Sequence, residues 1–132
     1  MNTKVIVSIC ISIALVGGSL YLISQEQVAP AGAQVQKNNV EVRDGVQYVT
    51  VTAQGGYFPR VSEIQPGMPT KLVVKTNGTY DCSASLVIRD VGYQKILPST
   101  GEEVIDIGVP TSGQKIQGVC GMGMFNFSLN AQ

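Results

Sequence analysis

The sequence contains no histidine and no tryptophan, and only 14% of its 132 residues are charged. Without histidine there is no imidazole to serve as the base of a nucleophilic triad. A blue-copper centre is excluded as well, because it needs two imidazoles beside its cysteine. Nine basic residues balance nine acidic ones, so no basic stripe is available for nucleic acid or anionic lipid. We therefore predict a protein that is not an enzyme and does not bind nucleic acid.

A long apolar run lies at the N-terminus. It extends from Val5 to Ile23 without a charged residue, which is long enough to span a bilayer. A secretory signal has a shorter apolar region, of about 7 to 15 residues, before its cleavage site. We predict that residues 1–24 are an uncleaved, single-pass anchor in the cell membrane, with cleavage at Ala33 as the alternative. The default orientation places the remaining chain outside the cytoplasm, and the weak flanking charges leave the cytoplasmic side open.

Two further regions follow the apolar run. Residues 25–39 are rich in Gln, Ala, Pro, Gly and Asn and have no apolar periodicity, which is typical of a flexible linker. Residues 40–132 contain short β-branched runs separated by Gly, Pro and Asn. This length, roughly 90 residues, is enough for one domain with one core.

The pattern of residues 40–132 predicts an all-β fold, either an antiparallel sandwich or a barrel, without a helix of useful length. The prolines fall between the apolar runs or at their edges, where a missing N–H costs no central hydrogen bond. We predict about seven strands. They lie at residues 48–52, 61–64, 71–75, 85–88, 104–109, 114–119 and 125–129.

Sulfur side chains are concentrated near the C-terminus. The segment Cys120-Gly121-Met122-Gly123-Met124 separates three of them by single glycines, and Cys82 precedes another predicted strand. In an extended segment residues i, i+2 and i+4 point to one face, so these three side chains can converge on an ion. Thiolate and thioether sulfur select Cu(I) over harder divalent ions. We predict that Cys82, Cys120, Met122 and Met124 hold one or two Cu(I) ions.

The cysteine pair has a simpler alternative, which is a disulfide. Closing a loop of 38 residues between Cys82 and Cys120 would stabilise the domain by about 3 to 4 kcal/mol in the chain-entropy model. Met122 and Met124 would then be ordinary packing or surface residues. Zinc is a poorer alternative, because a structural site needs further thiolate or imidazole ligands. The sequence leaves the oxidation state of the pair open.

The region from Gln47 to Gln132 resembles the cupredoxin family. The similarity rests on the Gly55-Gly56-Tyr57-Phe58-Pro59 segment, on Ile64–Pro69 behind it, and on the cysteine-bearing loop near the C-terminus. It implies a Greek-key β-sandwich with copper ligands from two loops. Cys82 then stands where an ordinary cupredoxin places its first histidine, and Met122 or Met124 replaces the second.

The lack of histidine makes the chain similar to one branch of that family, the membrane-anchored Cu(I) chaperones of the CupA type. In that branch a cysteine and a C-G-M-G-M loop bind one or two cuprous ions for delivery to a copper-exporting P-type ATPase. The resemblance implies that this chain sequesters Cu(I) and passes it to such an ATPase in copper homeostasis or resistance. Two alternatives stay open, namely an electron-transfer or accessory respiratory module and a disulfide-stabilised interaction domain.

Overall fold

The structure, a computed structural model, describes residues 39–132. The predicted anchor, residues 1–24, and the predicted linker up to residue 38 lie outside this range. Within the described part no helix has the length and apolar character needed to cross a membrane.

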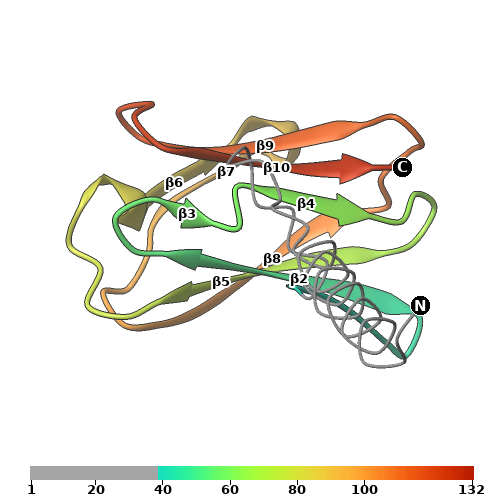
Figure 1. The fold of residues 1–132 in the computed structure, drawn as a ribbon, viewed down its shortest axis with the longest axis horizontal. Coiled ribbons are helices and arrows are strands. Elements are labelled where there is room, and N and C mark those ends of the chain that lie inside the picture. The colour runs from blue at the N-terminus through green and yellow to red at the C-terminus, as the bar shows by residue number, and fades with distance from the viewer. Residues whose placement is uncertain (1–38) are drawn as a thin grey trace, which may run out of the picture. The chain divides into compact units, whose positions relative to one another are not determined.

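Ten strands form two sheets of five strands each (Figure 1). In the first sheet the order is β1-β2-β5-β8, with β3 beside β2, and in the second it is β4-β10-β9-β6-β7. The first sheet consists of β1 (Val40–Arg43), β2 (Val46–Ala53), β3 (Tyr57–Phe58), β5 (Thr70–Thr76) and β8 (Gly101–Gly108). The second consists of β4 (Val61–Ile64), β6 (Ser85–Ile88), β7 (Tyr93–Ile96), β9 (Lys115–Cys120) and β10 (Asn126–Ala131).

The hydrophobic core lies between the two sheets, which Figure 1 shows as two layers. Alternation along each strand decides which side chains enter it, because successive residues point to opposite faces. On β2 every second residue is buried, ending with Val51 and Ala53. Phe127 of β10 and Tyr57 of β3 pack edge to face, with ring centroids 5.1 Å apart. The core therefore extends to the end of the domain where β9 stops and β3 begins.

Gly118 of β9 is directly opposite Phe127 of β10 in the antiparallel pair. The ring of Phe127 covers this glycine so closely that an added Cβ would lie 2.2 Å from the ring atom Cε1. A side chain and the ring cannot occupy this space together. Glycine at this position is thus required by packing rather than by backbone conformation.

The all-β prediction is confirmed, and each of the seven predicted strands corresponds to an observed one, namely β2, β4, β5, β6, β8, β9 and β10. The expected purely antiparallel pairing is wrong, because β2 pairs with β5 and β4 pairs with β10 in parallel. The reason is topological. After β2 and β3 the chain crosses to the other sheet to form β4 and then returns, so β5 runs in the same direction as β2.

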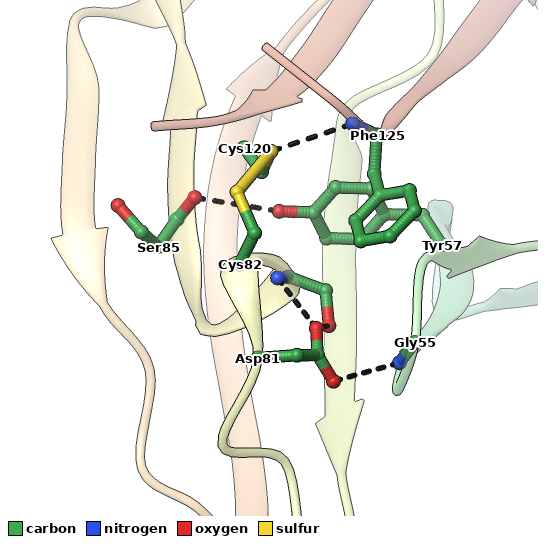
Figure 2. The surroundings of a disulfide bond; sticks show 8 residues. Gly55, Tyr57, Asp81, Cys82, Ser85, Cys120 and Phe125 are labelled. Carbon is green, nitrogen blue, oxygen red and sulfur yellow. Dashed lines mark hydrogen bonds between the residues drawn. A yellow bond between two sulfur atoms is a disulfide. The ribbon is translucent and has the colours of Figure 1, made fainter. Parts of the chain in front are cut away.

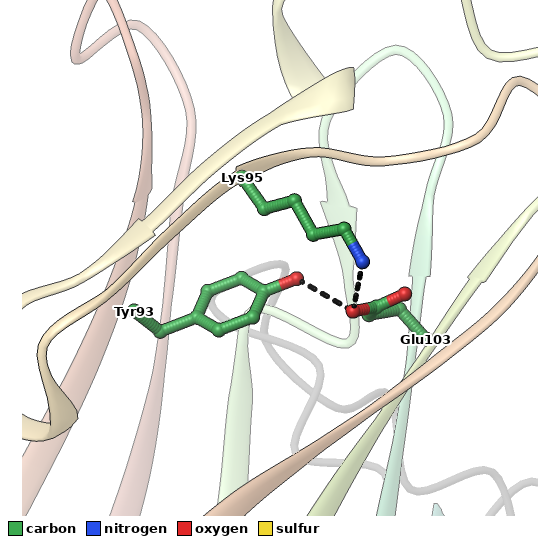
Figure 3. Close-up of polar contacts among 3 residues, drawn as sticks. All are labelled: Tyr93, Lys95 and Glu103. Atoms are coloured by element: carbon green, nitrogen blue, oxygen red, sulfur yellow. Dashed lines mark hydrogen bonds and ion pairs between the residues drawn. The ribbon is translucent and has the colours of Figure 1, made fainter.

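A polar cluster joins the edges of the two sheets (Figure 3). Lys95 Nζ lies 2.7 Å from Glu103 Oε1, and the Tyr93 hydroxyl donates a hydrogen bond of 3.2 Å to the same oxygen. Tyr93 and Lys95 belong to β7, whereas Glu103 belongs to β8. Lys95 holds the pKa of Glu103 below its ordinary value. Burial, followed by the charge of Glu103, raises the pKa of Tyr93 to about 12.

Glu103→Gln is expected to lower the free energy of unfolding by about 0.5 to 1 kcal/mol at pH 7. Because the folded-state pKa of Glu103 is lowered, its stabilisation is present above the ordinary value of 4.5 and is lost as pH falls through the lowered pKa. Near pH 2 the variant and the wild type should therefore be almost equally stable. Urea unfolding at both pH values measures this difference. An equal loss of stability at both pH values would contradict the role assigned to the Glu103 carboxylate. Glu63→Gln makes the same substitution at an exposed strand residue and serves as the control.

Candidate metal site

The two cysteines singled out by the sequence lie side by side. Cys82 is the first residue of the 3-10 turn η2 (Cys82–Ala84), immediately before β6, and Cys120 is the last residue of β9. Because β6 and β9 are neighbouring strands, with Leu86 opposite Cys120, the two Cα atoms are only 5.8 Å apart. The sulfur atoms are joined as a disulfide (Figure 2). The structure therefore shows the oxidised form of the pair.

Asp81 fixes the turn that carries Cys82. Its Oδ1 accepts hydrogen bonds from the Ser83 amide at 2.7 Å and the Ser83 hydroxyl at 2.5 Å. Its Oδ2 accepts one from the Gly55 amide at 2.9 Å. These hydrogen bonds hold the pKa of Asp81 below its ordinary value, and the one from the Ser83 hydroxyl has the largest effect. The carboxylate thus ties the turn of Cys82 to the loop before β3, and the cysteine is presented from a fixed backbone.

The methionine-bearing segment is a tight turn. The Gly123 amide donates to the Cys120 carbonyl at 2.8 Å, and the Cys120 amide donates to the Phe125 carbonyl at 2.9 Å. Gly123 has a φ of +72°, a conformation that favours glycine. At Gly121 an added Cβ would lie 2.6 Å from Ser85 Oγ. The extended conformation expected from the sequence is therefore wrong, and the two glycines are required by turn geometry and by lack of space.

Exposure changes sharply across the site. Cys120 is only 1% exposed and Cys82 is half-buried, whereas Met122 and Met124 are 75% and 63% exposed. The Phe125 amide donates a hydrogen bond of 3.4 Å to Cys120 Sγ. The arrangement is a sulfur pair at the end of the core, next to a surface turn that carries two thioethers.

The donors limit which ions the site could accept. Among residues 39–132 no group of three His, Cys, Asp or Glu side chains is placed to hold a metal ion. A metal at the reduced cysteine pair would thus have no third His, Cys, Asp or Glu ligand among these residues. Two thiolates with thioethers form a soft donor set, which suits Cu(I) and not the harder divalent ions.

Sequence reasoning missed two groups beside the pair. One is the Phe125 amide, because backbone donors leave no sequence signal. The other is the hydroxyl of Tyr57, which lies 3.5 Å from the Ser85 carbonyl oxygen, at the point where β6 meets the methionine turn. The Gly-Gly-Tyr segment supported the resemblance to the cupredoxin family, but it did not show where the hydroxyl would point.

Comparisons with known proteins found similar solved structures but no similar curated sequence. No protein-family model matches the sequence, and no curated protein sequence matches it either. Solved structures do match. The solution structure of a copper-binding protein in the apo form has a TM-score of 0.66 at 27% identity, over 76% of this chain and 100% of that one. The fold is that of copper-binding proteins.

A second solved structure supports the same statement about the fold. It is the metal-binding domain of the Cu(I)-exporting P-type ATPase CopA from Streptococcus pneumoniae D39, crystallised with Cu(I). The TM-score is 0.65 at 20% identity, over 76% of this chain and 98% of that domain. The first of these structures is described as a copper-binding protein and the second as a metal-binding domain, in agreement with the predicted relationship to copper proteins. Membership of the CupA-type branch stays a prediction.

Proposed function

We propose that this chain is a Cu(I)-binding protein of the cupredoxin type, with the reduced Cys82 and Cys120 as its two thiolate ligands. Met122 and Met124 complete the shell of the first ion or hold a second ion more weakly. The observation that carries the proposal is the direct contact of the two cysteines beside an exposed turn bearing two methionines. The likeness to an apo copper-binding protein supports it.

The charges of the ligands assign different roles to the two kinds of sulfur. Two thiolates on Cu(I) leave a net charge of minus one, and a thioether adds none. The cysteines therefore set the affinity, whereas the methionines set how readily the ion is exchanged. Since both thiols must lose a proton, copper uptake releases protons and the affinity falls as pH falls.

The exposure of the methionine turn supports transfer of the ion to a partner. An acceptor's thiolate can reach an ion next to the exposed turn and displace the ligands one at a time. We propose a copper-transporting P-type ATPase as the acceptor, because one such pump has a metal-binding domain with the same fold. The proposed membrane anchor, residues 1–24, would raise the effective concentration of the donor near a membrane pump.

The disulfide adds a requirement for loading. Sulfur atoms that are bonded to each other cannot act as thiolate ligands, so Cys82 and Cys120 must first be reduced. The chemistry is thiol–disulfide exchange with a dithiol, which becomes a disulfide as it gives two electrons and two protons to the pair. Copper binding should thus depend on the presence of a thiol reductant.

Anaerobic titration of the reduced full-length chain with Cu(I), against a competing chelator, tests the proposal. We expect one tightly bound equivalent. The double variant Met122→Leu, Met124→Leu should keep this equivalent and lose any second, weaker one, because leucine keeps the bulk and removes the thioether. Met68→Leu, in the loop before β5, is the matched control and should change neither. Failure of the reduced wild type to compete with the chelator would overturn the proposal.

The observed disulfide favours a second candidate, a disulfide-stabilised interaction domain. In that case Cys82 and Cys120 serve only to close a loop, which stabilises the fold by about 3 to 4 kcal/mol in the chain-entropy model. The purified protein would then show no free thiol at either position, and after reduction it would not bind copper. The same titration separates the two candidates.

A further inference from the structure

Tyr57 is held rigidly next to the cysteine pair. The residue is only 1% exposed, and its ring packs against Phe127 at a centroid distance of 5.1 Å. With the ring fixed, the one remaining freedom is rotation of the hydroxyl hydrogen. In Figure 2 the phenol oxygen points toward the disulfide. Tyr57 thus places a single O–H donor at the buried end of the site.

This donor has a poor partner in the oxidised structure. Its hydrogen bond to the Ser85 carbonyl is 3.5 Å long, at the outer limit for a hydrogen bond between oxygens. The same carbonyl already accepts a shorter bond, of 2.9 Å, from the Gly121 amide. A buried hydroxyl in this situation will turn to a stronger acceptor nearby, because charged acceptors form the stronger hydrogen bonds.

Backbone contacts place the Tyr57 hydroxyl where the two cysteine-bearing segments meet. Gly121 directly follows Cys120, and Ser85 directly follows the turn that begins with Cys82. The hydrogen bond between Gly121 and Ser85 therefore joins the two cysteine-bearing segments, and the Tyr57 hydroxyl lies at this junction. From this junction the phenol oxygen points toward the sulfur pair (Figure 2).

We propose that Tyr57 is a positioning residue that donates its O–H to a cysteine thiolate of the copper-loaded site. This inference rests on the proposed function. The loaded site carries a negative charge that the reduced, protonated apo pair lacks, so a donor beside it stabilises the loaded state more than the apo state. The Phe125 amide is already placed to donate to Cys120 Sγ, and Tyr57 supplies a second donor for the pair.

The surroundings keep the donor protonated. Burial, and then the carboxylate of Asp81, raise the pKa of Tyr57 well above its ordinary value. The phenol therefore stays neutral and keeps its O–H across the physiological pH range. It cannot compete as a phenolate for copper, so its action on the metal is through the hydrogen bond.

Tyr57→Phe in the reduced full-length chain tests the proposal, because it removes the oxygen and keeps the ring. We expect Cu(I) affinity to fall about tenfold or more in chelator competition. The ultraviolet charge-transfer band of the Cu(I)–thiolate bond should move to longer wavelength, since a thiolate that loses a hydrogen bond gives up charge more easily. A tyrosine that only packs the core would leave this band in place.

Tyr93→Phe is the matched control, because it removes a hydroxyl that binds Glu103 at the sheet edge. It should change neither the affinity nor the band. If the reduced wild type binds copper and Tyr57→Phe binds it with an affinity within twofold of wild type, the role of Tyr57 is overturned and the proposed function is not. Absence of copper binding in the reduced wild type would instead overturn the proposed function.

A second measurement on the wild type covers the case in which Tyr57→Phe does not fold. A buried hydroxyl proton exchanges slowly enough to be followed by proton NMR, assigned from its coupling to the Tyr57 ring. We expect its resonance to move downfield on Cu(I) loading of the reduced chain, as the hydrogen bond passes from the Ser85 carbonyl to a thiolate. An unchanged resonance would overturn the proposal.

Discussion

Replacing either Cys82 or Cys120 with serine is expected to abolish tight Cu(I) binding. In the proposed site each cysteine supplies one of the two thiolates. A serine hydroxyl is neutral at pH 7 and a harder donor than Cu(I) prefers. Mutating a residue that only hydrogen-bonds to a metal ligand already lowers metal affinity by about 10- to 100-fold. Loss of a ligand itself should therefore lower the affinity by more than about 100-fold. Anaerobic chelator competition on the reduced variants measures this loss.

The third cysteine provides the control for this experiment. Cys10→Ser makes the same exchange of sulfur for oxygen at a position in the predicted anchor, and it should leave the affinity unchanged. Wild-type protein kept oxidised should behave like the two serine variants until a dithiol is added. If Cys82→Ser or Cys120→Ser retains wild-type affinity, the assignment of the site is wrong.

Gly118→Val is expected to destabilise the fold severely. The added Cβ would meet the ring of Phe127 at 2.2 Å, with the position buried between two paired strands. Overpacking of a core commonly costs about 1 to 3 kcal/mol. A clash with an aromatic ring that has no room to move should reach about 3 kcal/mol or more, a large part of the roughly 5 to 15 kcal/mol that stabilises a typical domain. Urea unfolding of the purified protein measures the change.

Two comparisons identify the clash as the cause. Gln117→Val introduces the same side chain one residue earlier, on the exposed face of β9, and should change stability by no more than about 0.5 kcal/mol. Combining Gly118→Val with Phe127→Leu removes the ring, so the double variant should lose less stability than the sum of the two single variants. Strict additivity would mean that the ring does not explain the requirement for glycine.

Sequence patterns predicted seven of the ten observed strands and missed β1, β3 and β7. Strand β2 alternates between buried and half-exposed residues, and this period of two is visible in the sequence. Strand β7 was missed because Tyr93–Ile96 lies at a sheet edge with three of its four residues exposed, so burial imposes no pattern on it. Strand β3 has only two residues, next to Pro59, and reads as a loop.

For the candidate site, the proximity of the two cysteines was predictable and the local geometry was not. Cys82 and Cys120 could be paired because each lies at the end of a strand in a fold where such ends can meet. The conformation of the turn after Cys120 depends on a hydrogen bond to Phe125 at the end of the turn and on another to Ser85, which belongs to a distant segment. The oxidation state could not be predicted either, because the same proximity suits a disulfide and a metal. The hydroxyl of Tyr57 reaches the site only through the packing of its ring.

The methionine turn is shaped by main-chain hydrogen bonds and by its two glycines, whereas the side chains of Met122 and Met124 are mostly exposed. In the proposed site, the two methionine ligands are therefore separate from the residues that shape the turn. A histidine at residue 122 or 124 would introduce the first imidazole of the chain, moving selectivity toward divalent ions at little cost in stability. In the proposed site, a single substitution in the turn could thus change the preferred ion without changing the fold that supports the turn.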